Sequence, residues 1–253
     1  MADRPSIIFK YQGFNPQSIK NLNTHQLYFG PPANFNDPFD CAIPSPIAEP
    51  TPEESARLME HLRKIPSMGS HIEAMKASGS ENHLPQVLVD SVKHAISQNR
   101  ADFKDIGVAC FSECNNNSLM WAHYGDSCRG FCLGFDTSNS PFHLLRQVRY
   151  VDQPQHINIE KMTIEGPIDV VDGLFRTKSK DWEYEREWRV INQKVEALAY
   201  DPNSLRSIYF GLEAKDADIM DAREILMRFN PDTEFFRLQR NSTNFDVRFI
   251  SMK

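Results

Sequence analysis

Residues 181–190 alternate without interruption between two kinds of side chain. The mainly aromatic parity comprises Trp182, Tyr184, Arg186 and Trp188, and the charged parity comprises Glu183, Glu185, Glu187 and Arg189. Because successive side chains of a β-strand point to opposite faces, the pattern predicts a strand with one packing face and one carboxylate-rich face. Like charges on one face repel and cost free energy when they lose water, which favours a site for a cation, a metal or a sugar. A solvated edge strand, or a helix that pairs Glu185 with Arg189, explains the same residues without a function.

Strand-like and helix-like segments follow one another irregularly along the rest of the chain. Short apolar or alternating runs predict strands at residues 6–11, 27–29, 106–112, 129–135, 148–151, 207–210, 234–240 and 246–250. Capping residues, prolines and apolar spacing predict helices at residues 16–23, 53–104, 118–124, 157–178 and 214–229, with breaks near 66–69, 79–84 and 166–167. This arrangement favours an α+β fold over regular βαβ alternation. We expect a single domain over residues 1–253 with a helical insertion at residues 51–104.

The length, charge and apolar runs of the chain bear on whether it binds nucleic acid or a membrane. The chain has 253 residues and a net charge of −6, with no basic tract that would attract nucleic acid nonspecifically. No apolar run approaches the roughly 20 residues that span a bilayer, so we expect no membrane association. Five cysteines and the lack of a secretion signal predict reduced thiols and a cytoplasmic location.

The cysteines raise the question of a metal. Cys110 and Cys114 form one pair, Cys128 and Cys132 form another, and His123 lies between the pairs. Paired thiolates can bind zinc, but these spacings are at the long end of the structural pattern. Cys110 and Cys132 also lie in apolar runs, where cysteine commonly acts as a small buried hydrophobe. We therefore expect no zinc site at these cysteines and assign no metal-binding residue.

Two further groups of residues are candidates for binding. Trp121, His123 and Tyr124 follow a strand end that carries Ser112, and aromatic faces can stack planar rings or hold a cation. The alternative is that the aromatic residues belong to the core and the histidine is buried and satisfied. The turn at Asn36-Asp37-Pro38 either is turn chemistry alone or presents an amide and a carboxylate to a ligand. The chain has no phosphate-binding loop, no dinucleotide fingerprint and no nucleophile elbow.

These motifs, taken in order between about residues 7 and 212, resemble one bacterial family, the domain-of-unknown-function 2971 family. The segments that carry the resemblance are Phe9-Lys10-Tyr11, Phe35-Asn36-Asp37-Pro38-Phe39, Cys110-Phe111-Ser112, Met120-Trp121-Ala122-His123-Tyr124, residues 130–135, and Trp182-x-Tyr184-Glu185-x-Glu187-x-Arg189. The resemblance is weakest across the helical insertion, and the family name implies no established activity.

The layout also resembles that of ADP-ribosyltransferases, which hold nicotinamide adenine dinucleotide (NAD) in a crevice of a split, mixed α+β sheet. The resemblance implies that Lys10 or Tyr11 on the first strand, Ser112 on a middle strand and Glu185-x-Glu187 on a late strand face the dinucleotide. The chain departs from that pattern because it has no first-strand arginine or histidine and no Ser-Thr-Ser motif, and Arg189 has no standard counterpart.

The resemblance implies a chemistry in which NAD is the substrate and the nicotinamide–ribose bond breaks through a sugar cation. Glu187 would stabilise the cation, Glu185 would orient or deprotonate the acceptor, and Arg189 would fix the carboxylates or meet a phosphate. Either Trp121 or Tyr124 would stack on nicotinamide. The remaining expected contacts to the dinucleotide are Lys10, Tyr11, Asn36, Asp37, Ser112 and His123. The acceptor is a protein side chain, a nucleic acid or water.

Two other functions remain open. Asp37, Glu185 and Glu187 together could bind Mg²⁺ in a metal-dependent hydrolase or nuclease. The aromatic and acidic face could instead recognise a small ligand in a sensor domain that catalyses nothing.

Overall fold

The computed structural model describes residues 3–41, 47–79, 87, 89–90, 105–153, 156–166, 168–241 and 247–252. The chain divides into two compact units. The first unit comprises Met1–Asn34, Asp105–Tyr150 and Lys180–Lys253, and the second comprises Phe35–Lys104 and Val151–Ser179.

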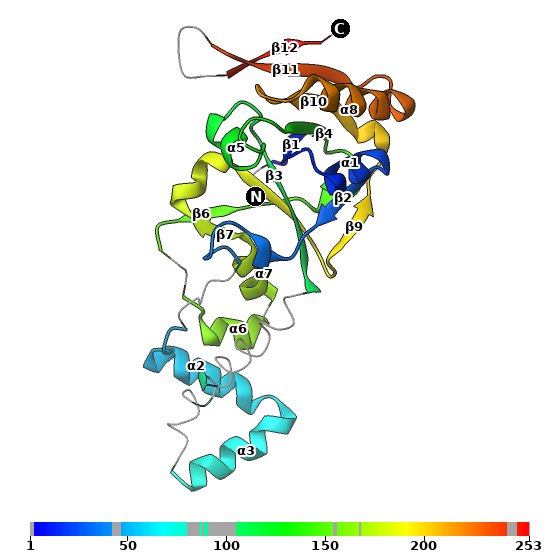
Figure 1. Cartoon of the computed structure of the whole chain (residues 1–253). Helices are drawn as coiled ribbons and strands as arrows, with labels where there is room; N and C mark the ends of the chain where they lie inside the picture. The colour runs from blue at the N-terminus through cyan, green and yellow to red at the C-terminus, as the bar shows by residue number, and fades with distance from the viewer. Residues whose placement is uncertain are drawn as a thin grey trace. The chain divides into compact units, whose positions relative to one another are not determined.

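The first unit is built on an eight-stranded sheet with the order β12-β11-β10-β4-β1-β3-β8-β5 (Figure 1). Its strands are β1 (Ile7–Gln12), β3 (Gly107–Ser112), β4 (Phe131–Asp136), β5 (Arg146–Gln147), β8 (Glu187–Asn192), β10 (Leu205–Phe210), β11 (Glu234–Arg240) and β12 (Val247–Ser251). Neighbours pair antiparallel except β10 and β11, which are parallel. The expectation of an α+β fold with a mixed sheet is confirmed.

Helices and short elements complete the first unit. They are α1 (Pro16–Asn23), α5 (Ser118–His123), α8 (Asp216–Phe229), the paired strands β2 (Gln26–Phe29) and β9 (Glu196–Ala199), and the 3₁₀ helices η1 (Pro32–Asn34), η4 (Phe142–Leu144), η5 (Lys180–Glu185) and η6 (Pro202–Ser204). Helix α1 begins where the sequence predicts, because the Asn15 side chain accepts a hydrogen bond from the Ser18 N–H and Pro16 occupies the first turn.

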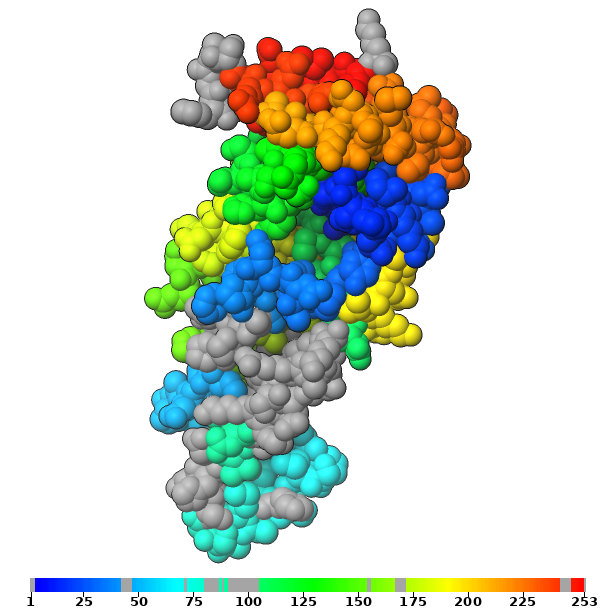
Figure 2. Space-filling model, viewed as in Figure 1, coloured from blue at the N-terminus to red at the C-terminus, as the bar shows by residue number. Residues whose placement is uncertain are grey.

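The two faces of the sheet have different cores. One face packs with α1 and α8 into the larger cluster, to which Leu22 of α1 and Leu226 of α8 belong. The other face packs with α5 through Met120 and Trp121, and the strands that contribute to this second cluster are β1, β4, β10, β11 and β12. Figure 2 shows segments that are distant in the sequence lying together in this unit, the green β3–β4 region next to blue N-terminal and orange C-terminal residues.

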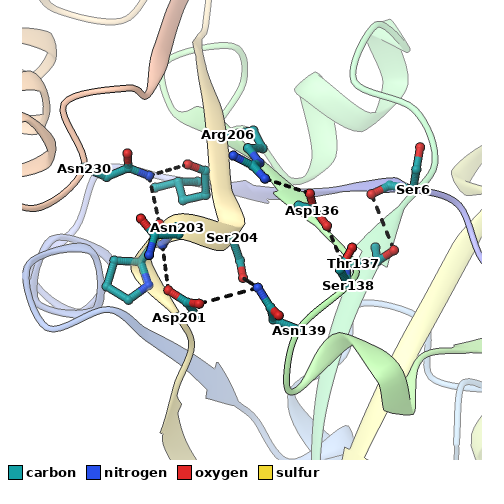
Figure 3. A network of polar contacts seen from close by, with 12 residues as sticks. Ser6, Asp136, Thr137, Ser138, Asn139, Asp201, Asn203, Ser204, Arg206 and Asn230 are labelled. Atoms are coloured by element: carbon teal, nitrogen blue, oxygen red, sulfur yellow. Dashed lines mark hydrogen bonds and ion pairs between the residues drawn. The ribbon is translucent and has the colours of Figure 1, made fainter.

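A hydrogen-bonded network fixes the loops at one end of β4 and β10 (Figure 3). The Asn139 amide donates to Asp201 and Ser204, and Asn230 donates to the carbonyl of Leu205 at 2.8 Å. Asp136 accepts from the Ser138 N–H and pairs with Arg206 at 3.0 Å. These hydrogen bonds with Ser138 and Arg206 lower the pKa of Asp136 to about 2. These contacts join the loops to one another, which favours a structural role for the network.

The second unit is mainly helical. It contains α2 (Pro52–Arg63), α3 (Pro66–Ala77), α6 (Ile159–Glu165), α7 (Ile168–Arg176) and β7 (Thr177–Ser179), and β6 (Arg149–Val151) lies where the chain passes between units. Buried Leu58, Leu62, Ile72, Val89 and Ile159 form its core. Helices are present in both expected segments, 53–104 and 157–178. The break between α2 and α3 falls at residues 64–65, just before the predicted 66–69, and residues 177–178 belong to β7 rather than to a helix. Most of residues 80–104 lies outside the described residues.

Candidate functional site

Residues 181–190 do not form the single strand that their alternation predicts. Lys180–Glu185 form the 3₁₀ helix η5, Arg186 has a left-handed φ of 44°, and β8 begins only at Glu187. Hydrogen bonds from the end of β3 hold this turn: the Ser112 hydroxyl donates to the Glu185 carbonyl at 2.5 Å, and the Glu113 N–H donates to the Arg186 carbonyl at 3.2 Å. Contacts from a distant segment therefore override the local pattern. The prediction is wrong before Glu187.

From Glu187 onward the predicted alternation is present. Trp188 and Val190 belong to the larger hydrophobic cluster, while Glu187 and Arg189 lie on the opposite face of β8. The register with β3 places Glu187 opposite Ser112 and Arg189 opposite Cys110. The polar face of β8 is thus continued on β3 by Ser112 and Cys110.

Glu187 and Arg189 form a buried bidentate ion pair. The Arg189 Nε and Nη2 donate to the two carboxylate oxygens of Glu187 at 2.7 and 2.8 Å. The exposed fractions are 0% for Arg189 and 4% for Glu187, so the solvated-face alternative is wrong for these residues. The helical alternative is also wrong, because Arg189 lies in strand β8, where it pairs with Glu187.

The Cys110 thiol joins this pair. Burial, followed by the charge of Glu187, raises the pKa of Cys110 well above its ordinary value, and the thiol hydrogen-bonds Glu187. A thiol with a raised pKa stays protonated at neutral pH, so it donates to the carboxylate. Sequence analysis treated Cys110 as a hydrophobe and missed this contact, although Cys110 and Ser112 share a parity on β3.

Lys10 lies where strands β1 and β3 separate. The two strands share one residue pair, Phe9 with Ser112, whereas β1 pairs with β4 over six residues. The Lys10 ammonium donates to the Cys110 carbonyl at 3.1 Å and lies 5.1 Å from the centre of the Phe111 ring. Burial lowers the pKa of Lys10, and the nearby negative charge of Glu187 opposes that shift.

Helix α5 brings Tyr124 to Glu185. The Tyr124 hydroxyl donates to Glu185 Oε1 at 2.6 Å, and Glu185 is 2% exposed. The Asn117 side chain caps α5 by accepting from the Leu119 N–H at 2.8 Å. Seven residues make these contacts, through a side chain or a backbone carbonyl, and we call them the polar cluster: Lys10, Cys110, Ser112, Tyr124, Glu185, Glu187 and Arg189.

Three other predicted residues are not members of this cluster: Trp121 and Tyr11 pack in the protein interior, and His123 faces solvent. Trp121 is 0% exposed, its Nε1 donates to the Asn115 carbonyl at 2.7 Å, and its ring meets that of Tyr11 edge-on. Its burial leaves Trp121 no face for nicotinamide, so the structure assigns it to packing, as the alternative proposed. The Tyr11 hydroxyl donates to the Cys114 carbonyl. His123 is exposed rather than buried, with its ring 6.1 Å from that of Trp182.

Asn36 and Asp37 belong to the second unit. Asp37 is buried and its Oδ1 accepts from the Phe39 N–H at 2.9 Å, the local contact of an Asx turn. The turn-chemistry interpretation is therefore correct for this side-chain contact. The second unit also contains a buried ion pair that sequence analysis missed, Lys178 with Asp40 at 3.4 Å.

The two metal hypotheses are a zinc site on the cysteines and a Mg²⁺ site on Asp37, Glu185 and Glu187. All five cysteines are thiols without disulfide bonds. Across the described ranges, no three histidine, cysteine or acidic residues are grouped so that they could hold a metal ion. None of the helices described here is long and apolar enough to cross a membrane.

Comparison with known proteins bears on the segment that contains α5, η5 and the start of β8. No curated protein and no solved structure matches the chain. A family model described as "Protein of unknown function (DUF2971)" matches residues 120–190. That segment contains four members of the polar cluster, Tyr124, Glu185, Glu187 and Arg189. The predicted resemblance to the DUF2971 family is thus confirmed over the part of the chain that supplies most of the polar cluster.

Proposed function

We propose that the protein uses NAD as a substrate and cleaves the nicotinamide–ribose bond, in the manner of an ADP-ribosyltransferase or an NAD glycohydrolase. The observation that carries the proposal is the buried Glu187 carboxylate, oriented by both donors of Arg189 beside the separation of β1 and β3. A fixed carboxylate in water-poor surroundings stabilises a developing cation far better than a hydrated one does.

Glu187 acts on the sugar in this proposal. As the bond to nicotinamide breaks, its electrons leave with the nicotinamide nitrogen and positive charge develops on the ribose. Glu187 hydrogen-bonds a ribose hydroxyl and stabilises that charge, while Arg189 keeps the carboxylate in one orientation. Lys10, within electrostatic reach of Glu187, supplies a positive charge for the phosphates of the dinucleotide.

Glu185 and Tyr124 act on the acceptor side. Glu185 takes the proton of the acceptor as the acceptor oxygen or nitrogen bonds to the ribose carbon. Tyr124 orients that carboxylate through its 2.6 Å hydrogen bond. Its ring is half-buried, in contrast to that of Trp121, and offers the aromatic surface for nicotinamide.

The test measures nicotinamide released from NAD by the purified protein. We expect Glu187→Gln, which keeps the shape of the side chain, to slow release by a factor of about 100 or more, because one preorganised stabilising group contributes on that scale. Glu234→Gln is the control, since Glu234 is exposed at the start of β11. Thermal melting of each variant separates loss of chemistry from loss of folding. Lack of release by the wild-type protein, or an unaffected Glu187→Gln variant, overturns the proposal.

The same preparation distinguishes the other two functions. NAD cleavage requires no metal, so a chelator should leave nicotinamide release unchanged, whereas it would abolish a metal-dependent hydrolase. A sensor domain would bind NAD stoichiometrically and release no nicotinamide.

A further inference from the structure

A groove of about 780 Å³ lies in the first unit, outside the polar cluster. Its lining residues are Glu113, Gln147, Val148, Arg149, Tyr150, Glu183, Tyr184 and Arg186. Its volume is within the range of sites that hold small organic ligands, roughly 300–1,000 Å³. We propose that this groove binds a mononucleotide, with its phosphate on the two arginines and its base against the two tyrosines.

The arginines provide the anion-binding part of the groove. Arg149 and Arg186 are both exposed, and neither guanidinium has an ion-pair partner among the residues described. A guanidinium presents a planar set of donors that matches the oxygens of a phosphate. Two such groups in one concave surface can hold a phosphate from two sides.

Arg186 is placed in the groove by an unusual backbone. Its φ of 44° is sparsely populated by residues other than glycine, at a cost of about 1–3 kcal/mol. Its N–H donates to the Glu183 carbonyl and its carbonyl accepts from the Glu113 N–H, both at 3.2 Å. All three residues line the groove, so the same hydrogen bonds that impose this conformation also shape the wall.

The tyrosines provide the surface for a planar ring. Tyr150 and Tyr184 are half-buried, and the Tyr150 hydroxyl accepts the Glu187 N–H at 2.7 Å. That hydrogen bond fixes the Tyr150 ring and connects the groove to the backbone of the polar cluster. Stacking of a base on an aromatic ring contributes about 1–3 kcal/mol and tolerates any base.

The carboxylates decide between a single nucleotide and a nucleic acid strand. Glu113 and Glu183 line the same groove as the two arginines, and the whole chain carries a net charge of −6. The Trp188 Nε1 donates to Glu113 at 2.7 Å and so fixes that carboxylate. Carboxylates accept hydrogen bonds from ribose hydroxyls and base amino groups but repel a chain of phosphates. The charge balance therefore favours one phosphate with its nucleoside.

Calorimetric titration of the full chain with adenosine monophosphate, adenosine and inorganic phosphate tests this inference. We expect the monophosphate to bind more tightly than either component alone. Arg149→Gln and Arg186→Gln should each weaken its binding about tenfold, because a hydrogen bond to a charged group contributes on that scale. Arg248→Gln is the control, since Arg248 is an exposed arginine on β12. Equal binding of adenosine and its monophosphate, tighter binding of a single-stranded oligonucleotide, or unchanged affinity in both arginine variants overturns the inference.

The inference goes beyond the proposed function and does not rest on it. Glu187→Gln should leave the affinity for adenosine monophosphate within about twofold, because Glu187 does not line the groove and the substitution keeps the backbone N–H that donates to the Tyr150 hydroxyl. Lack of nicotinamide release by the wild-type protein, with monophosphate binding intact, would refute the proposed function alone. Intact release with no monophosphate binding would refute the groove alone.

Discussion

Replacing Arg189 with methionine tests whether Glu187 depends on its partner. Methionine keeps an unbranched apolar stem, although it is shorter than arginine, and it removes both donors, at 2.7 and 2.8 Å, from a carboxylate that is 4% exposed. Breaking a buried ion pair by removing one partner costs about 3–5 kcal/mol, because the remaining charge is left uncompensated. We expect Arg189→Met to lower the free energy of unfolding by that amount, measured by urea denaturation at neutral pH.

A matched control exists on the surface. Arg129 donates to both carboxylate oxygens of Asp126 at 3.2 and 2.8 Å, so the pair has the same bidentate arrangement. The exposed fractions of its side chains are 57% and 46%, and exposed pairs contribute about 0–1 kcal/mol. Arg129→Met should therefore change stability by no more than about 1 kcal/mol. Equal costs for Arg189→Met and Arg129→Met would refute the argument that burial makes the Glu187 pair costly to break.

Two further predictions concern the hydrogen-bonded network that contains Asp136 and the turn at Arg186 before β8. The folded-state pKa of Asp136, about 2, lies below its unfolded value, so its contribution to stability is present at neutral pH and is lost as the pH falls towards about 2. Asp136→Asn should accordingly be less stable than the wild type at pH 7 and nearly as stable as the wild type near pH 2. A difference in urea midpoint that stays constant between these pH values would contradict the claim that ionised Asp136 stabilises the fold. Ser112→Ala removes one donor to the Glu185 carbonyl and one acceptor for the Cys114 N–H, and we expect a loss of about 1–3 kcal/mol in urea unfolding. Ser78→Ala, at an exposed helix end, is its control, and a cost as small as that of the control would show that the hydroxyl does not hold the turn.

Elements whose causes are local could be predicted from the sequence. Helix α1 has its predicted bounds because Asn15 and Pro16 act within one turn, and β11 has its predicted bounds of Glu234–Arg240. The turn at Arg186 could not be predicted, because the groups that hold it are on β3, more than 70 residues away in the sequence. A period of two over residues 181–190 says nothing about such a distant donor.

The sequence predicts which types of residue the candidate site contains, but it does not predict which of them contact one another. The alternation correctly placed Glu187 and Arg189 on one face and Trp188 on the other. The contacts of Cys110 and Tyr150 depend on the register of β3 and β8 and on the path of the chain after β5, which no local pattern encodes. Trp121 has the composition of a binding residue, and only its burial identifies it as part of the core.

The energetics of β8 favour a functional interpretation of its polar face. On one face Trp188 and Val190 pack into the core, which shows that apolar side chains are accommodated at this strand. On the other face the Glu187–Arg189 pair contributes little net stability, because the cost of removing two charges from water offsets most of their attraction. Replacing both residues with apolar ones, as in Glu187→Leu with Arg189→Met, should therefore recover much of the stability that Arg189→Met loses. A double variant that folds as well as the wild type but releases no nicotinamide would separate the two roles, because a pair that is dispensable for folding and required for turnover acts on a substrate.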